Sequence, residues 1–87
     1  MSENTDRVAI AADGDWTADV DAEEGVVVNW FVGEGSAVEE GDSLCEIQVE
    51  KVSVDMEAPT DGTLDEIAHD EGDEFTIGDT LAWIEPG

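Results

Sequence analysis

Very few side chains in this sequence could do chemistry. Lys51 is the only lysine, His69 the only histidine and Cys45 the only cysteine. One histidine and one cysteine are too few parts for a zinc site or a catalytic dyad. We therefore expect His69 to be a structural or surface residue. Cys45 lies in a segment of alternating apolar residues, so we expect a small buried side chain. Lys51 remains the candidate for chemistry.

Acidic residues dominate the composition. The 87 residues include 25 Asp and Glu but only 2 Lys and Arg, which gives a formal net charge of -23. Such a charge repels nucleic acids and anionic membranes, so neither is an expected partner. The acidic run over residues 19–24 has Glu24 where the sixth position of an EF-hand loop needs glycine. We interpret the run as solvated surface and predict no metal site.

The same charge predicts a fold that depends on salt. Val, Ile, Leu and Phe make up 20 of the 87 residues, just above the range typical of disordered chains. Self-repulsion should oppose compaction in dilute buffer, and much less near about 1 M salt. We therefore expect a folded monomer from a halophile. The N-terminus MSENTDRVAI lacks the pattern of a signal peptide, so the expected location is the cytoplasm.

The chain contains an internal repeat. Residues 24–47 match residues 61–84 without gaps at an offset of 37, and seven of the 24 pairs are identical. The identical pairs are Gly25/Gly62, Glu34/Glu71, Gly35/Gly72, Gly41/Gly78, Asp42/Asp79, Leu44/Leu81 and Ile47/Ile84. Aligned glycines indicate that the backbone takes a positive φ or turns tightly at the same places in both halves. The simplest interpretation is one supersecondary unit used twice about a pseudo-two-fold axis.

Each copy of the repeat has the pattern of an all-β fold, with short runs rich in β-branched residues separated by Gly-Asp or Glu-Gly. We predict strands over residues 26–32, 37–38, 43–49, 52–58, 63–68, 74–75 and 81–84, with a further candidate at 8–11. Residues 1–23 are expected to form an N-terminal strand and an acidic loop. Residues 24–87 hold the repeats, in a single domain overall. Trp30, Trp83 and Phe75 fall on strand positions and are expected in the core.

A hairpin is predicted between the repeats. The alternation of apolar residues flips between Val49 and Val52, as a two-residue turn at Glu50 and Lys51 requires. The expected cross-strand pairs are Val49/Val52, Ile47/Val54 and Cys45/Met56 on the buried face, and Gln48/Ser53 and Glu46/Asp55 on the other. The tip holds Lys51 in water, where other proteins can reach it. Nothing nearby would activate its amine, so its chemistry would come from acylation by a separate enzyme.

Several motifs around Lys51 resemble the biotin/lipoyl attachment domain, over residues 24–85. They are VEKV at the hairpin tip, the following MEAPTDG, the flanking EGVVVNWFV and the closing GDTLAWIE. Within that family, Glu50-Lys51-Val52 is similar to the lipoyl domains of 2-oxo-acid dehydrogenase acyltransferases, whereas biotin carriers usually place Met on both sides of the lysine. The usual N-terminal opening of the family is replaced by the sequence DGDWT.

The resemblance implies a fold and a function. The fold is a flattened barrel or sandwich of two four-stranded antiparallel sheets with pseudo-two-fold symmetry. The function is that of a carrier, not an enzyme, with lipoate joined to Lys51 by a lipoate–protein ligase or lipoyl transferase that reads Glu50 and Val52. The arm would serve 2-oxo-acid dehydrogenase, acyltransferase and dihydrolipoamide dehydrogenase components. Because no linker or acyltransferase domain follows in the sequence, a free-standing carrier is expected.

Two other interpretations remain open. Lys51 could carry biotin for a carboxylase, an interpretation that the missing methionines disfavour. The chain could also be an unmodified interaction module of the same fold, which a sole lysine at a hairpin tip argues against.

Overall fold

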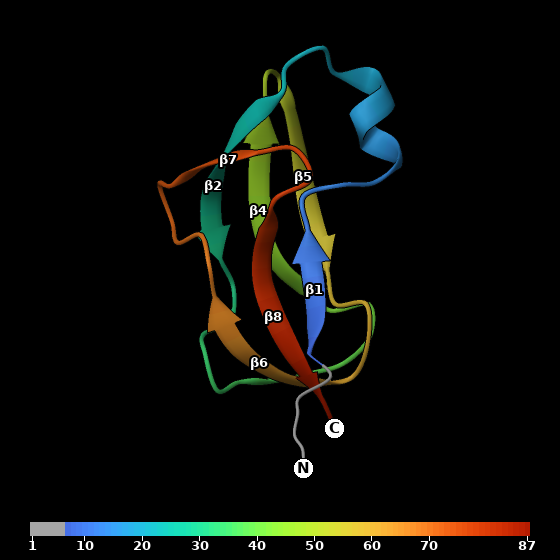
Figure 1. Ribbon diagram of the computed structural model, residues 1–87, viewed down its shortest axis with the longest axis vertical. Coiled ribbons are helices and arrows are strands. Elements are labelled where there is room, and N and C mark those ends of the chain that lie inside the picture. Colours follow the sequence, from blue (N-terminus) through green and yellow to red (C-terminus); the bar gives the residue numbers. More distant parts are fainter. Residues whose placement is uncertain (1–6) are drawn as a thin grey trace.

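Two antiparallel four-stranded sheets enclose one apolar core (Figure 1). The computed structural model describes residues 7–87, apart from the side chains of residues 15 and 19. The strands are β1 (Val8–Ala11), β2 (Glu24–Trp30), β3 (Ala37–Val38), β4 (Ser43–Val49), β5 (Val52–Glu57), β6 (Gly62–Ile67), β7 (Glu74–Thr76) and β8 (Thr80–Pro86). One sheet has the order β1-β8-β6-β3 and the other β5-β4-β2-β7. The predicted all-β sandwich is confirmed, as two separate sheets rather than a closed barrel.

The two sheets repeat the same hydrogen bonds, which confirms the predicted symmetry. Gly35 N–H donates to the Leu64 carbonyl at 2.7 Å, and 37 residues later Gly72 N–H donates to the Val27 carbonyl at 2.8 Å. The strand orders match in the same way, since β5, β4, β2 and β7 occupy the places of β1, β8, β6 and β3. Each half therefore completes the sheet edge of the other.

Identical acidic residues in the two repeats make identical contacts. Glu34 accepts a hydrogen bond from the Ile67 backbone N–H at 2.8 Å, and Glu71 accepts one from the Trp30 N–H at 3.0 Å. Asp42 and Asp79 each accept the N–H of the residue three positions before them, at 3.0 and 2.9 Å. These carboxylates satisfy backbone donors that the ladders leave unpaired. The same acidic residue therefore occurs at these positions in both repeats because it has the same structural role in each.

Of the three identical glycine pairs, two behave as predicted and one does not. Gly35 and Gly72 have φ of 91° and 86°, and the pair at 41 and 78 is also left-handed. Gly25 and Gly62 instead lie in strands without positive φ, so the prediction of a turn at this pair is wrong. A Cβ on Gly62 would stand 2.3 Å from the Glu85 carbonyl oxygen. The glycine is needed there because a neighbouring backbone approaches closely.

We expect Gly62→Ala to destabilise the fold by about 1–3 kcal/mol or more, because backbone rather than a movable side chain blocks the new methyl group. Gly33→Ala is the matched control, since nothing lies within 4 Å of its Cβ position and its φ is not positive. Its effect should stay within about 0.5 kcal/mol. Chemical denaturation in a fixed high salt concentration measures both. Equal midpoints for the two variants would contradict this account.

A β-bulge fills the core from β4. The register of β4 against β5 shifts between Ser43 and Cys45, so the two adjacent side chains Leu44 and Cys45 are both fully buried. The buried apolar residues are Ile10, Ala12, Val27, Val38, Leu44, Cys45, Ile47, Val49, Met56, Ala58, Leu64, Phe75, Leu81, Ala82 and Ile84. Burial of Cys45 and Phe75 confirms their predicted places.

Of the two tryptophans predicted for the core, one packs against it and the other lies on the outer face. Trp30 is half-buried against the core, and its Nε1–H donates to the His69 carbonyl at 2.8 Å. Trp83 lies between the buried Ala82 and Ile84 on β8, so alternation turns it to the outer face. There the Arg7 guanidinium carbon stands 4.7 Å from its ring centroid. The prediction that Trp83 belongs to the core is therefore wrong.

The N-terminal segment is more ordered than a loop. A single 3-10 turn, η1 (Asp15–Asp19), interrupts the predicted acidic loop, and Trp16, Val20 and Ala22 pack against the core. These apolar residues hold the segment across one end of the sandwich. In residues 7–87 no helix is both long and apolar enough to span a membrane. The predictions for residues 1–6 lie outside the described part.

Strand β2 begins two residues earlier than predicted. Glu24 and Gly25 pair with Thr76 and Phe75 of β7, which extends the strand at its start. At its other end, Phe31 still donates its N–H to the Leu44 carbonyl at 2.9 Å, although the chain has begun to bend. The pairing with β7 could not be read from the local pattern.

Candidate functional site

The β4–β5 hairpin has the predicted register. The pairs are Val49/Val52, Gln48/Ser53, Ile47/Val54, Glu46/Asp55 and Cys45/Met56. On the inner face Val49 and Ile47 are fully buried, while their partners Val52 and Val54 on the edge strand are half-buried. On the outer face the carboxylates of Glu46 and Asp55 stand on directly opposed residues, an unfavourable like-charge pair in dilute buffer.

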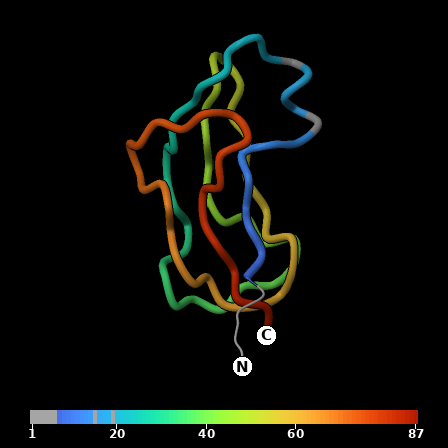
Figure 2. Tube along the Cα trace, in the orientation of Figure 1, coloured from blue at the N-terminus to red at the C-terminus, as the bar shows by residue number. Residues whose placement is uncertain are grey.

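Lys51 lies exposed in the two-residue turn of this hairpin. The turn projects from one end of the sandwich, beside η1, while the C-terminus and the start of β1 lie at the opposite end (Figures 1 and 2). The pseudo-symmetry explains this arrangement, because the end of β8 and the start of β1 occupy the place in their sheet that the β4–β5 turn occupies in the other sheet. The lysine is therefore presented at the end of the sandwich away from the C-terminus and the start of β1.

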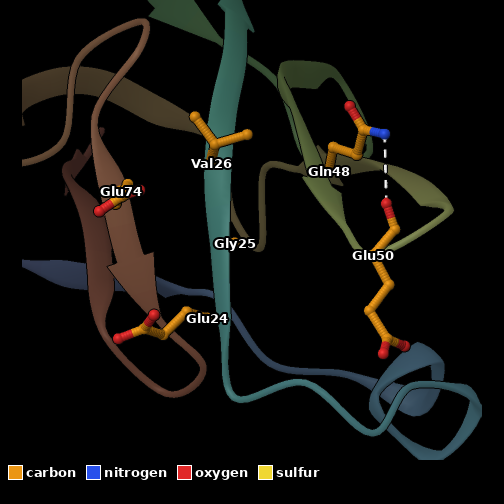
Figure 3. Close-up of a pocket in the computed structure, with 6 residues that line it drawn as sticks. All are labelled: Glu24, Gly25, Val26, Gln48, Glu50 and Glu74. Atoms are coloured by element: carbon orange, nitrogen blue, oxygen red, sulfur yellow. Dashed lines mark hydrogen bonds between the residues drawn. The ribbon is translucent and has the colours of Figure 1, made fainter.

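Glu50 has an unusual backbone for its residue type. Its φ is 56°, and it is the one non-glycine residue with positive φ in residues 7–87. Its carboxylate Oε1 accepts the backbone N–H of Asp21 at 3.2 Å, and its carbonyl accepts Nε2 of Gln48 at 3.2 Å. Figure 3 shows the amide of Gln48 directed at that carbonyl, and the carboxylate directed toward the N-terminal segment.

A shallow groove of about 320 Å³ lies beside the hairpin. It is lined by Glu24, Gly25, Val26, Gln48, Glu50 and Glu74 (Figure 3). Three of the lining residues are glutamates, which makes the surface next to Lys51 acidic. The sequence does not predict the contacts of Asp21 and Gln48 with Glu50, and no periodicity connects Asp21 with a turn 29 residues away.

His69 has structural contacts. Its Nδ1 lies 3.1 Å from the Thr80 carbonyl, and its ring meets that of Phe75 edge-on at a centroid distance of 6.4 Å. Its Nε2 is 3.9 Å from Asp79, a residue whose carboxylate already caps the Thr76 N–H. Among the described side chains, no group of three or more His, Cys, Asp or Glu is arranged to hold a metal ion.

Cys45 is predicted to be unreactive while the protein is folded. Burial, with the nearby charge of Asp55, raises the pKa of its thiol to about 12. At pH 7 we expect a maleimide to modify it about 1000-fold more slowly than in the unfolded chain, since each pKa unit changes the thiolate fraction tenfold. Modification timed by mass spectrometry, with and without urea, checks this. Similar rates in both states would contradict the burial.

The same thiol links stability to alkaline pH. The folded state holds the proton more tightly than the unfolded chain, whose thiol has a pKa near 9.0. The contribution of the neutral thiol to stability is therefore fully present below about pH 9 and is lost as the pH rises toward 12.

Family comparison agrees with this geometry. Residues 18–84 match the biotin and lipoyl family described as "Biotin-requiring enzyme". The dihydrolipoyllysine-residue acetyltransferase component of the pyruvate dehydrogenase complex of Staphylococcus epidermidis is 39% identical over 62 residues, 71% of this chain and 14% of that protein. Its counterpart in Staphylococcus aureus has the same identity and coverage. The chain thus spans about one seventh of the length of these curated relatives.

Three solved structures are similar to this chain, at different levels of sequence identity. The lipoyl domain of the 2-oxoglutarate dehydrogenase complex from Azotobacter vinelandii superposes with a TM-score of 0.66 at 31% identity, covering 76% of this chain and 85% of that one. The urea carboxylase of Kluyveromyces lactis gives a TM-score of 0.77 at 22% identity, covering 98% of this chain and 7% of that one. A long-chain acyl-CoA carboxylase gives 0.76 at 17%, with 100% and 8% covered.

The two carboxylases show the shared fold alone. The lipoyl domain and the acetyltransferases are above 30% identical to this chain, and their names specify the lipoyl group. The chain therefore belongs to the biotin/lipoyl attachment family and, within it, to the lipoyl domains.

Proposed function

We propose that this chain is a carrier whose Lys51 bears lipoate in amide linkage. The observation that carries the proposal is the place of the sole lysine, in the turn of the hairpin of a lipoyl domain. In the attachment step, the neutral amine of Lys51 attacks the acyl carbon of an activated donor such as an acyl-adenylate. A C–N bond forms, the C–O bond to the adenylate breaks and one proton is released.

The protein's own part is presentation of the arm. Bound lipoate supplies a disulfide that takes up an acyl group and electrons and passes them on. A small rigid domain raises the effective concentration of this arm at each partner site. Fixed pairs on the buried face of the hairpin, such as Val49 with Val52, hold the base of the arm in place. Loss of the lysine charge would take the formal net charge from -23 to -24.

The partners belong to the same proposal. The chain would be acted on by a lipoate–protein ligase or lipoyl transferase, which contacts Glu50 and Val52 beside the lysine. It would then serve dehydrogenase, acyltransferase and dihydrolipoamide dehydrogenase components of a 2-oxo-acid dehydrogenase complex. The curated relatives are named for the pyruvate complex and the structural relative for the 2-oxoglutarate complex, which supports this class. We place the carrier, as a monomer, in a salt-rich cytoplasm because of its charge.

Intact mass of the protein purified from its own host, followed by fragmentation, tests the proposal. A lipoyl increment on Lys51 is expected. A biotin increment would move the chain to the carboxylases, whose attachment lysine usually lies between two methionines, whereas Glu50 and Val52 flank it here. An unmodified Lys51 in cells with an active ligase would leave an interaction module of the same fold.

A further inference from the structure

The turn that holds Lys51 is stabilised from outside the hairpin. Glu50 adopts a left-handed backbone conformation, which is unfavourable for residues other than glycine. Glycines with positive φ, such as Gly35 and Gly41, have no such energetic penalty because they lack a Cβ atom. A strained residue persists only where its surroundings hold it. The contacts that hold Glu50 are therefore contacts that determine how Lys51 is presented.

Two contacts hold Glu50, and they come from different parts of the chain. The Gln48 amide donates to its carbonyl from within the hairpin. The Asp21 backbone N–H donates to its carboxylate from the segment that precedes β2. The second contact joins the tip to another element, so it can restrain motion that the hairpin alone would allow.

The donor is itself held in place. Val20 and Ala22, on either side of Asp21, pack against the core. One residue further on, the Glu23 carbonyl accepts the Ile77 N–H at 2.8 Å. Asp21 thus presents its N–H from an anchored backbone, even though its own side chain is exposed.

We propose that Glu50 is a positioning residue for Lys51. The hydrogen bond from the Asp21 N–H to the Glu50 carboxylate, here called the brace, connects residues 20–23 to the turn. Through it, these residues set the orientation of the turn that the modifying enzyme meets. This inference rests on the proposed carrier function. The carboxylate acts as an acceptor for the brace, so its charge is not the feature that matters.

Asp21→Pro removes the donor without touching the hairpin. Val20 has φ -126° and ψ 149°, the conformation favoured before proline. Asp21→Ala is the matched control, because it removes the same carboxylate and keeps the N–H. With a purified bacterial lipoate–protein ligase, lipoate and ATP, we expect Asp21→Pro to lower kcat/KM about 3- to 10-fold, the range expected for one lost hydrogen bond, and Asp21→Ala to leave it near the wild-type value.

The acceptor is tested separately. Glu50→Gln keeps an oxygen that can accept the Asp21 N–H, so hydrogen exchange at the Asp21 amide should stay near the wild-type rate, whereas Glu50→Ala removes the acceptor and should accelerate it. In kcat/KM, the double variant Asp21→Pro/Glu50→Ala should be no worse than Glu50→Ala alone, because the brace is already lost in that variant.

Circular dichroism at the same salt concentration establishes that each variant is folded. Equal kcat/KM for Asp21→Pro and Asp21→Ala, or exchange of the Asp21 amide as fast in Glu50→Gln as in Glu50→Ala, would overturn the brace. Failure of the wild-type chain to be lipoylated would instead overturn the carrier function. In that case, exchange of the Asp21 amide in Glu50→Gln and Glu50→Ala still decides whether the brace exists.

Discussion

Replacing Lys51 with arginine is expected to abolish lipoylation completely. Lys51 is the only lysine in the chain, and the arginine guanidinium stays protonated and cannot be acylated in its place. Arginine keeps the positive charge, and the turn is exposed, so the fold should not change. Intact mass after incubation with ligase, lipoate and ATP gives the result directly. An increment that persists in Lys51→Arg would place the modification elsewhere and contradict the assignment.

Moving the lysine by one residue tests its position rather than its presence. The double variant Glu50→Lys/Lys51→Glu keeps the composition and the net charge of -23. It places the amine on the left-handed residue and removes the carboxylate that Asp21 holds. We expect lipoylation to fall by at least about 100-fold, since a near-attack geometry is lost when the reacting atom is displaced. Equal rates for this variant and the wild type would show that any exposed lysine suffices.

Removing salt is expected to unfold the protein. Its net charge is -23, and acidic groups face each other at Glu46 and Asp55 and again around the groove beside the hairpin. The Debye length grows from about 3 Å at 1 M salt to about 30 Å at 0.01 M, so repulsion between distant carboxylates returns as salt is removed. Circular dichroism should show strand structure at about 1 M KCl and its loss at about 0.01 M.

Two further measurements make the salt prediction sharper. Cys45 is fully buried, so its reaction with maleimide should begin at the salt concentration where the strand signal is lost. Glu46→Gln removes one of the opposed carboxylates and should lower the midpoint salt concentration, by a stability gain of about 0.2–1 kcal/mol. Full order in millimolar salt, with Cys45 still protected, would contradict an adaptation to a salt-rich cytoplasm.

The hairpin and the repeat could be predicted from the sequence because both depend on local periodicity. A two-residue turn produces the change of parity between Val49 and Val52, and the structure has that register. The offset of 37 predicted matching halves, and the hydrogen bonds of Gly35 and Gly72 match at that offset. With the register known, the place of Lys51 follows without any knowledge of the rest of the molecule.

Contacts between distant segments were decided only by the tertiary structure. Gly62 was predicted as a turn and proved to be a place where the Glu85 backbone approaches, because composition does not distinguish these two needs for glycine. Trp83 faces outward because a register shift between β1 and β8 leaves the adjacent Leu81 and Ala82 both buried, which shifts the alternation along β8 by one residue. The hydrogen bond from Asp21 to Glu50 joins residues 29 positions apart. Alternation reports which face a side chain occupies, whereas packing alone determines which backbone lies across from it.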